Sequence, residues 1–370
     1  MIAVTRIGTD VVVVGAGAAG CTAALQLRSG GRDVVIVDRA NGPVTRFCGE
    51  FLSGEALEPL QRLGVRVDRL GANPVRTSAL YGARGSSVQI DLPAAGCGLA
   101  RRTLDGELLR LAVERGCRSI GGVSVDGIER RPTGFVVAAD QLRIEAAAVV
   151  GAWGRRSSLD RVLERDFLRR DSDWVGVKAH FRGPAPSTEV GLYLFPGGHC
   201  GFVNIDGALG TLGILARRSA LQSAGRPTDL IARARSCNAA LDQRLRSGDL
   251  DLDSILTVGQ VPFVRKQAVL DGILLVGDAG CVTAPFLGLG VTNAIRSGAA
   301  AARALLTSSS PTQSYAAWRR RTVDRRRRLG YAASAGLSSP WIGETAVGGM
   351  AFAPGLMRAI YSLSRTPEPA

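Results

Sequence analysis

Asp10-Val11-Val12-Val13-Val14-Gly15-Ala16-Gly17-Ala18-Ala19-Gly20 joins four consecutive valines to a glycine-rich turn near the start of the chain. The short β-branched run predicts a strand that is buried on both faces, as in parallel sheets. Residues 18–29 are rich in alanine and leucine, lack proline and are followed by two glycines, which predicts a helix. A second apolar run over residues 33–37 predicts another buried strand. Together these segments predict a βαβ unit.

The spacing of Gly15, Gly17 and Gly20 is typical of a turn that binds the pyrophosphate of a dinucleotide. Gly15 permits the tight turn, Gly17 lets the backbone approach the phosphates, and Gly20 lets the helix pack closely on the strand. The start of the helix offers unpaired amides and a partial positive charge to the phosphates. Asp38, at the end of the second strand, is placed to accept hydrogen bonds from an adenosine ribose. The pattern predicts a dinucleotide site but does not distinguish NAD from FAD.

The composition indicates a globular protein without a metal site or a disulfide framework. The chain has 370 residues, of which 46% are hydrophobic and 21% are charged, as is usual for soluble domains. Its seven cysteines show no CxxC spacing, which argues against disulfides and zinc and favours a reducing cytoplasm. The apolar segments are broken by glycine, proline or charges before they reach membrane-spanning length, and the first strand leaves no room for a signal peptide. We expect a cytoplasmic protein with at most peripheral membrane contact.

The net charge of +14 comes almost wholly from arginine, because only Lys178 and Lys266 are lysines. Arg319–Arg321 and Arg325–Arg328 form the densest cluster, on a predicted helix near the C-terminus. At helical spacing these arginines surround most of the helix instead of forming one stripe. We expect a solvated basic face or contact with an acidic surface, and no specific binding of nucleic acid. A basic protein that binds nucleic acid or a membrane surface is the alternative from a different functional class.

The rest of the chain predicts a second sheet inserted into the dinucleotide-binding domain. Helices are predicted over residues 54–63, 103–115, 228–240 and 300–306. Strands are predicted over residues 77–81, 87–92, 122–129, 134–139, 141–145, 147–151, 174–181, 190–195, 201–205, 211–215, 255–263 and 273–276. The helix over 103–115 has leucines on one face and charged residues, Asp105 among them, on the other. Because a buried parallel-type strand reappears as late as 273–276, the first domain is predicted to be discontinuous.

These segments predict an α/β fold with three parts. The first is a discontinuous Rossmann-type domain over residues 1–75, 97–165 and 256–310. The second is an antiparallel β-sheet substrate domain over residues 76–96 and 166–255. A helical C-terminal segment over residues 311–370 completes the chain.

Four segments together resemble the group of flavoproteins with a single FAD-binding domain, which includes p-hydroxybenzoate hydroxylase, geranylgeranyl reductase and flavin-dependent halogenases. The resemblance covers most of residues 10–306. Its segments are Gly15–Gly20 with Asp38, Arg101-Arg-Thr-Leu-Asp105, Gly272–Gly280 and Pro285–Gly298.

The resemblance implies bound FAD, with Asp278 at the ribityl and pyrophosphate region. It also implies that the amides of the turn and helix start after Pro285 lie beneath the isoalloxazine, where they stabilise negative charge. The cofactor-binding residues predicted from the motif and the resemblance are Gly15, Gly17, Ala18, Ala19, Gly20, Asp38, Arg39, Cys48, Arg101, Gly277, Asp278, Gly288, Gly290 and Val291.

Within this group, the sequence is most similar to geranylgeranyl reductase-like proteins. Cys48-Gly49-Glu50 and Tyr193-Leu-Phe-Pro-Gly-Gly-His199 resemble segments that face the flavin in those proteins. The resemblance makes Cys48, Tyr193 and His199 the candidate catalytic residues. Each also has an alternative interpretation, because a buried cysteine or tyrosine can serve packing alone and a loop histidine can have no catalytic role.

Three departures separate the chain from particular members of the group. Gly288-Leu289-Gly290 stands where the reductases carry Gly-Glu-Gly, so a carboxylate beside the flavin is missing. Trp153 lies where aromatic hydroxylases carry the aspartate of an Asp-Gly motif. The chain has no lysine before Lys178, whereas halogenases use a lysine between their flavin and substrate sites.

The resemblance implies an FAD-dependent oxidoreductase that acts on a hydrophobic polyketide, isoprenoid or phenolic compound. Because of the missing glutamate, we expect a monooxygenase that hydroxylates or epoxidises through a C4a-hydroperoxyflavin. The alternative is reduction of a C=C bond by reduced FAD. The chain has no second GxGxxG, so NAD(P)H, or a partner flavin reductase, is expected to reduce the flavin transiently.

Overall fold

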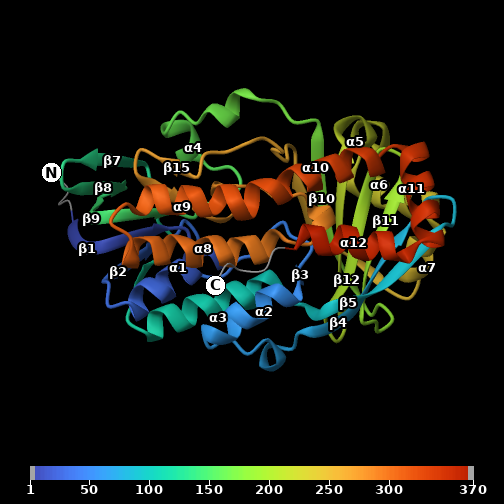
Figure 1. Ribbon diagram of the computed structural model, residues 1–370, viewed down its shortest axis with the longest axis horizontal. Coiled ribbons are helices and arrows are strands. Elements are labelled where there is room, and N and C mark those ends of the chain that lie inside the picture. Colours follow the sequence, from blue (N-terminus) through green and yellow to red (C-terminus); the bar gives the residue numbers. More distant parts are fainter. Residues whose placement is uncertain (1–4, 366–370) are drawn as a thin grey trace.

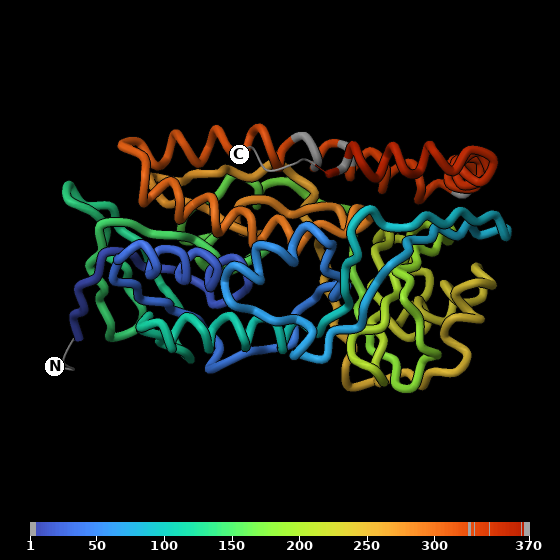
Figure 2. The backbone as a smooth tube through the Cα atoms, turned by 60° about the horizontal axis from the view of Figure 1, so that its bottom comes forward, coloured from blue at the N-terminus to red at the C-terminus, as the bar shows by residue number. Residues whose placement is uncertain are grey.

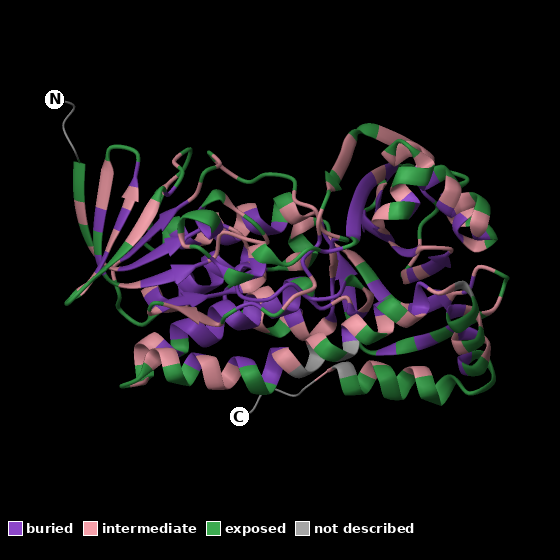
Figure 3. Ribbon diagram, turned by 90° about the horizontal axis from the view of Figure 1, so that it is seen from above, coloured by how far each residue is buried: buried purple, intermediate pink, exposed green. Residues whose placement is uncertain are grey.

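The computed structural model describes residues 5–365, apart from the side chains of residues 325, 326, 329, 340 and 364. Two eight-stranded sheets lie beside each other, and helices cover them (Figure 1). Buried residues concentrate on both sheets and on the helices between them, whereas the outer helices are mostly exposed (Figure 3). The fold is the α/β, Rossmann-type fold with an inserted sheet that the sequence predicts.

The first sheet carries the βαβ unit. Its central strands are parallel, in the order β16 (Ile273–Leu275), β9 (Leu142–Gly151), β1 (Thr5–Val14), β2 (Val34–Val37) and β6 (Arg118–Ile120). The antiparallel strands are β15 (Val269–Leu270), β7 (Gly127–Arg131) and β8 (Gly134–Ala139). The two strands expected over 141–145 and 147–151 are one strand, β9, because β1 pairs with it over almost its whole length.

Glycine is required at Gly15, in the turn after β1, and at Gly20, in the first turn of α1 (Ala18–Ser29). Gly15 has a φ of +113°, and a Cβ there would collide with the carbonyl of Ala152, which directly follows β9. A Cβ on Gly20 would collide with the carbonyl of Gly15. The turn and the close helix–strand approach predicted for these glycines are therefore confirmed. The remaining helices around this sheet are α2 (Gly54–Arg62), η1 (Val67–Leu70), α3 (Arg101–Glu114), α4 (Ser158–Val162), η2 (Asp166–Arg169), η3 (Gly277–Ala279), η4 (Pro285–Leu287) and α8 (Gly290–Thr307).

The second sheet is mixed and not purely antiparallel as expected. Its order is β14 (Asp249–Val258), β10 (Trp174–Arg182), β13 (Leu209–Arg217), β12 (Gly198–Asp206), β11 (Glu189–Phe195), β4 (Asn73–Tyr81), β5 (Ser87–Gly98) and β3 (Phe51–Leu52). β11 pairs with β4 in parallel, because the chain crosses the first sheet before it returns beside β4. The strand expected near 255–263 is β14, which ends at Val258 and pairs with β10.

Three helices cover one face of the second sheet: α5 (Arg218–Ala224), α6 (Pro227–Cys237) and α7 (Ala239–Leu245). The single helix expected over 228–240 is divided at Asn238. The Asn238 side chain accepts the amide of Leu241 and donates to the carbonyl of Leu194. It thereby caps α7 and ties it to β11.

The C-terminal segment is helical, as expected. It comprises α9 (Pro311–Arg319), a π-helical turn η5 (Arg320–Asp324), α10 (Arg325–Leu337), α11 (Pro340–Phe352) and α12 (Pro354–Ser364). These helices run along one side of the molecule from the first sheet to the far end of the second (Figure 2). Over the described part of the chain, no helix is long and apolar enough to cross a bilayer.

The structure corrects the prediction of a solvated basic face for one arginine of the cluster, Arg319. Its side chain is buried, and its guanidinium donates to the carbonyls of Lys266, Gln267 and Gly280. A basic helix face was expected at this position, but the sequence could not show that core carbonyls face the helix here. Arg320 is exposed, and the side chains of Arg325 and Arg326 lie outside the described residues.

We predict that Arg319→Met lowers the free energy of unfolding by about 3 kcal/mol, because buried carbonyls lose charged donors. Arg320→Met, one residue away on the exposed side, is the control and should change it by less than about 0.5 kcal/mol. Urea denaturation of the FAD-loaded proteins measures both. Equal urea midpoints for the two variants would contradict the structural role of Arg319.

Candidate functional site

A cavity of about 1350 Å³ lies between the two sheets and the C-terminal helices. Pockets for one small ligand occupy about 300–1,000 Å³, so this cavity has room for a cofactor and a substrate. Its lining changes character along its length. Charged side chains, among them Arg46, Arg155 and Asp278, line one part, whereas aliphatic side chains of β4, β11 and α10–α12 line another.

The first turn of α1 faces the charged part of the cavity. Gly17, Ala18 and Ala19 line it, and no side chain caps the amides at this helix start. The guanidinium of Arg46 lies over the turn, since a Cβ on Gly17 would be 3.7 Å from its Cζ. Free amides, a helix N-terminus and an arginine form a site suited to a pyrophosphate.

Arg46 is a site residue that the sequence analysis missed, and Asp105 is one that it misplaced. Asp105 was expected on the exposed face of its helix, but it is buried. Its carboxylate accepts hydrogen bonds from Arg46 Nε at 2.9 Å and from Arg101 Nη2 at 2.9 Å. The helical pattern did not reveal this, because it assigns charged residues to the outer face. The structure places Asp105 on the inner face, where both arginines reach it.

Asp38 contacts the glycine turn. Its carboxylate accepts the amide of Ala16 at 2.6 Å and that of Ala40 at 2.8 Å. Asp38 does not line the cavity, whereas the neighbouring Arg39 does. The predicted ribose contact of Asp38 therefore stays a prediction, and the structure shows the carboxylate bracing the turn.

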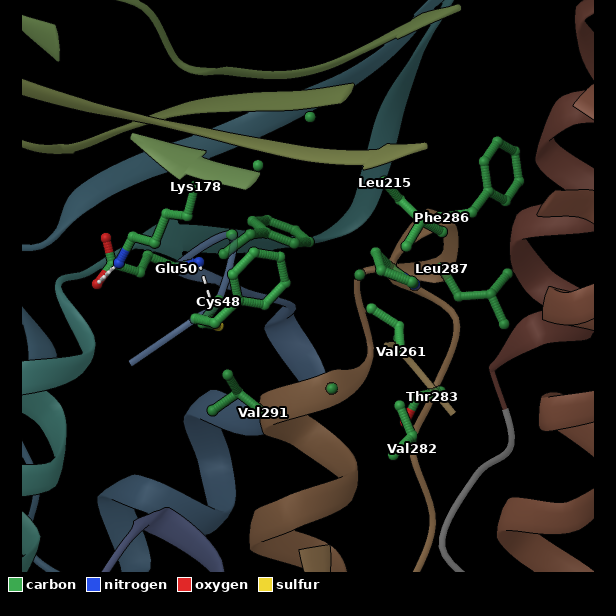
Figure 4. Close-up of a pocket in the computed structure, with 18 of the residues that line it drawn as sticks. Cys48, Glu50, Lys178, Leu215, Val261, Val282, Thr283, Phe286, Leu287 and Val291 are labelled. Atoms are coloured by element: carbon green, nitrogen blue, oxygen red, sulfur yellow. Dashed lines mark hydrogen bonds and ion pairs between the residues drawn. The ribbon is translucent and has the colours of Figure 1, made fainter. Parts of the chain in front are cut away.

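A second uncapped helix start faces the same cavity. α8 begins at Gly290, and Gly288, Gly290 and Val291 line the cavity; Val291 projects from the first turn of this helix (Figure 4). The carboxylate of Asp278 also lines it, with Arg155 Nε 3.5 Å away. The partial positive charge of the α8 N-terminus can stabilise a negative charge in this part of the cavity.

Buried basic side chains hold the carbonyls of the segment that carries Asp278. Lys266 Nζ donates to the carbonyl of Asp278 at 2.8 Å, and Arg165 donates to that of Ala279 at 2.8 Å. Arg319 donates to the carbonyl of Gly280. Burial lowers the pKa of Lys266 to about 7. The sequence pattern gave no indication of these contacts, which fix the backbone that presents Asp278 to the cavity.

The turn after Cys48 is held by a buried carboxylate. Glu50 Oε1 accepts from Lys178 Nζ at 2.9 Å and from the amide of Arg101 at 2.9 Å. Glu50 Oε2 lies 2.9 Å from His180 Nε2 and 2.6 Å from Thr211 Oγ1. Burial alone would raise the pKa of Glu50, but the hydrogen bond with His180 and the charge of Lys178 outweigh it and lower the pKa to about 2. Glu50 is therefore ionised, and Lys178 points directly at it (Figure 4).

The turn places Cys48 in the cavity wall. The amide of Glu50 donates to Cys48 Sγ at 3.3 Å, and Glu50 adopts a positive φ of 57°. A non-glycine residue in this conformation is strained unless its surroundings hold it. The four partners of its carboxylate provide that restraint.

The three candidate catalytic residues lie in different environments. Cys48 and His199 line the cavity, and His199 is 2% exposed. Neither ring nitrogen of His199 has a hydrogen-bond partner among the described residues, and burial lowers its pKa to about 4. Tyr193 does not line the cavity. Its ring stacks on Tyr81, with centroids 4.9 Å apart, on the sheet face that α5–α7 cover, so its expected place beside the flavin is wrong.

Most of the predicted cofactor residues do meet at the cavity. Those that line it are Gly17, Ala18, Ala19, Arg39, Cys48, Arg101, Gly277, Asp278, Gly288, Gly290 and Val291. Gly15 and Gly20 shape the turn behind it. Trp153 also lines the cavity, and its indole nitrogen donates to Asp160 at 2.9 Å.

One large cavity is surrounded by two helix N-termini, an arginine over the glycine turn and Asp278. This arrangement defines a dinucleotide-dependent oxidoreductase of the flavoprotein class. Residues 8–316 match the model of the FAD binding domain family. The chain belongs to this family and is an FAD-dependent oxidoreductase.

Relatives include a menaquinone reductase of Mycolicibacterium smegmatis, 31% identical over 84% of this chain and 79% of its own. A digeranylgeranylglycerophospholipid reductase of Methanothermobacter thermautotrophicus is 27% identical over 78% of this chain and 75% of its own. The chain is thus geranylgeranyl reductase-like.

Solved structures share the fold. A geranylgeranyl bacteriochlorophyll reductase-like protein of Thermoplasma acidophilum has a TM-score of 0.78 at 20% identity, covering 94% of this chain and 91% of its own. The flavin-dependent brominase Bmp2 has a TM-score of 0.79 at 21% identity, covering 96% and 93%.

We predict that Arg46→Ala weakens FAD binding roughly 10–100-fold, since a charge-assisted bond to phosphate is worth about 1.5–3 kcal/mol. Arg32→Ala, at an exposed position after α1, is the matched control. Titration of the apoprotein with FAD, followed by flavin fluorescence, gives both dissociation constants. A constant for Arg46→Ala equal to that of the control would remove Arg46 from the FAD site.

Proposed function

We propose that the protein uses FAD to reduce C=C bonds in a long apolar substrate of the isoprenoid class. The observation that carries the proposal is the aliphatic part of the cavity, which continues from the cofactor end. Leu80, Leu192, Leu337, Met350 and Met357 are among the residues that line it. An extended hydrocarbon chain fits such a lining, because each methylene that it buries is stabilised by about 0.8 kcal/mol.

The names of the relatives support reduction. Both relatives described above are reductases, and one acts on a lipid that carries geranylgeranyl chains, according to its name. The Cys48-Gly49-Glu50 turn that resembles those of geranylgeranyl reductases is built into this cavity by the Glu50 contacts.

When bound and reduced, FAD would supply a hydride for one carbon of the double bond, and a proton must reach the other carbon. We assign proton delivery to Cys48, whose thiol lines the cavity. We assign substrate orientation to His199. Its two nitrogens are buried without partners in the described part of the chain, and a carbonyl or hydroxyl group of the substrate would satisfy one of them. NAD(P)H or a partner flavin reductase supplies the electrons in this proposal.

A monooxygenase is the second candidate, favoured by Leu289 in place of a glutamate. The side chain of Leu289 is fully buried and does not line the cavity. The replacement therefore affects packing at the start of α8 more directly than it affects the cavity, and we place reduction first.

Product analysis tests the choice between these reactions. The FAD-loaded enzyme is reduced with dithionite without oxygen and mixed with geranylgeranyl phospholipid or a polyprenyl quinone in detergent. A C=C reductase oxidises its flavin under these conditions and gives a product with two more hydrogens in its isoprenoid chain, which fragmentation distinguishes from reduction of a quinone ring. If the flavin is oxidised only after oxygen is admitted, and the product gains one oxygen atom, the protein is a monooxygenase instead. If neither the oxygen-free nor the oxygenated reaction gives a product, both the reductase and the monooxygenase proposals are overturned.

We predict that His199→Phe raises KM at least about 10-fold while FAD affinity is unchanged, because the substrate loses one buried hydrogen bond. His199→Gln, which keeps an amide donor and acceptor, should recover part of this loss. Steady-state kinetics with the active substrate, together with FAD titration, measures both. An unchanged kcat/KM in His199→Phe would show that the histidine serves packing alone.

A further inference from the structure

The last two helices expose an unusual amount of apolar surface. Ten large hydrophobic residues are exposed in the described part of the chain, and six of them lie on α11 and α12. These six, which are between 41% and 95% exposed, are Trp341, Ile342, Phe352, Leu356, Ile360 and Leu363. We call them the C-terminal apolar surface. Grouped exposed residues of this kind mark a contact with another molecule or with a membrane.

The apolar residues of α12 form two adjacent faces. Leu356, Ile360 and Leu363 recur at a spacing of four and three residues, which places them in one stripe along the exposed side. Met357 and Tyr361 lie beside that stripe and line the cavity. One face of the helix therefore closes the cavity, whereas Leu356 and Leu363 on the other are more than half exposed.

The C-terminal apolar surface is continuous with the substrate part of the cavity. Ile342 and Ile360 are more than two-fifths exposed and also line the cavity. α11 and α12 contact each other and extend over the end of the second sheet (Figures 1 and 2). Phe352, the most exposed of the six, ends α11 at the junction between the two helices.

Basic side chains adjoin this surface. The guanidinium of Arg84 lies 4.5 Å from the ring centre of Trp341, and both Arg84 and Arg358 are exposed. An amphipathic surface of leucine, phenylalanine and tryptophan with neighbouring arginines is typical of proteins that bind the interface of anionic bilayers. A second copy of this chain fits less well, because each copy carries a net charge of +14 and like charges repel.

We propose that the C-terminal apolar surface inserts into the interface of an anionic lipid bilayer and brings the substrate part of the cavity to the membrane. The insertion itself stands on the exposed residues and the adjoining arginines. Delivery of a lipid substrate from the bilayer rests, in addition, on the proposed function.

Vesicle co-sedimentation of the FAD-loaded protein tests the insertion. The variant Phe352→Ser/Leu356→Ser/Leu363→Ser changes three residues that do not line the cavity. The matched control, Val113→Ser/Val162→Ser/Leu252→Ser, changes three exposed hydrophobic residues elsewhere on the surface. The vesicles contain phosphatidylglycerol and phosphatidylcholine, or phosphatidylcholine alone.

We expect the parent and the control to bind the anionic vesicles at least about 10-fold more strongly than the neutral vesicles, because arginines near the surface each favour anionic lipid. The triple variant should lose at least about 30-fold in vesicle affinity, because three apolar side chains no longer insert. Equal binding of parent and triple variant, or no binding of the parent, would overturn the proposal. A parent dimer in sedimentation velocity that the triple variant lacks, without vesicle binding, would assign the surface to self-association.

Turnover separates this proposal from the proposed function. With a short water-dispersed isoprenoid, the triple variant should match the parent, whereas with substrate in vesicles it should be at least about 10-fold slower. If no isoprenoid is turned over but vesicle binding is lost in the triple variant, the membrane contact stands and the proposed function falls.

Discussion

The carboxylate of Glu50 is the interaction on which the site depends. It accepts Lys178 and His180 from β10, Thr211 from β13 and the amide that begins α3. One buried charge thereby joins the turn that carries Cys48 to the second sheet and to a helix of the first. Removing one partner of a buried ion pair leaves an uncompensated charge and typically costs about 3–5 kcal/mol. Because the cavity lies between the two sheets, this pairing helps to define its shape.

A similar arrangement fixes a second part of the cavity wall. Lys266, Arg165 and Arg319 donate to carbonyls of the residues from Asp278 to Gly280. These donors occupy the carbonyl side of the segment, while the carboxylate of Asp278 lines the cavity. Arg319 belongs to α9, so the C-terminal helices are coupled to the cofactor wall as well as to the substrate part of the cavity.

Local patterns in the sequence predicted the βαβ unit well. The helix expected over 18–29 is α1, because helix start, apolar content and terminal glycines are all local features. Contacts between distant residues were not predicted. Nothing near Arg46 in the sequence indicates that it lies over Gly17, and alternation along β11 identifies two faces without showing which one meets the cavity. Tyr193 was misplaced for that reason, and Asp105 was misplaced because its arginine partners lie on another loop and on the preceding turn of its helix.

The position of the C-terminal helices is consistent with the demands of an isoprenoid substrate. A hydrocarbon chain that passed through water would lose about 0.8 kcal/mol of stabilisation for each exposed methylene. In the proposed arrangement, α12 presents Leu356 and Leu363 to the bilayer and Met357 to the cavity, so the two apolar environments are separated by the width of one helix. The hydrocarbon chain of the substrate can then exchange one apolar environment for another without full hydration. In this proposal, the exposed apolar stripe, which is unfavourable in water, and the aliphatic cavity wall serve a single physical purpose.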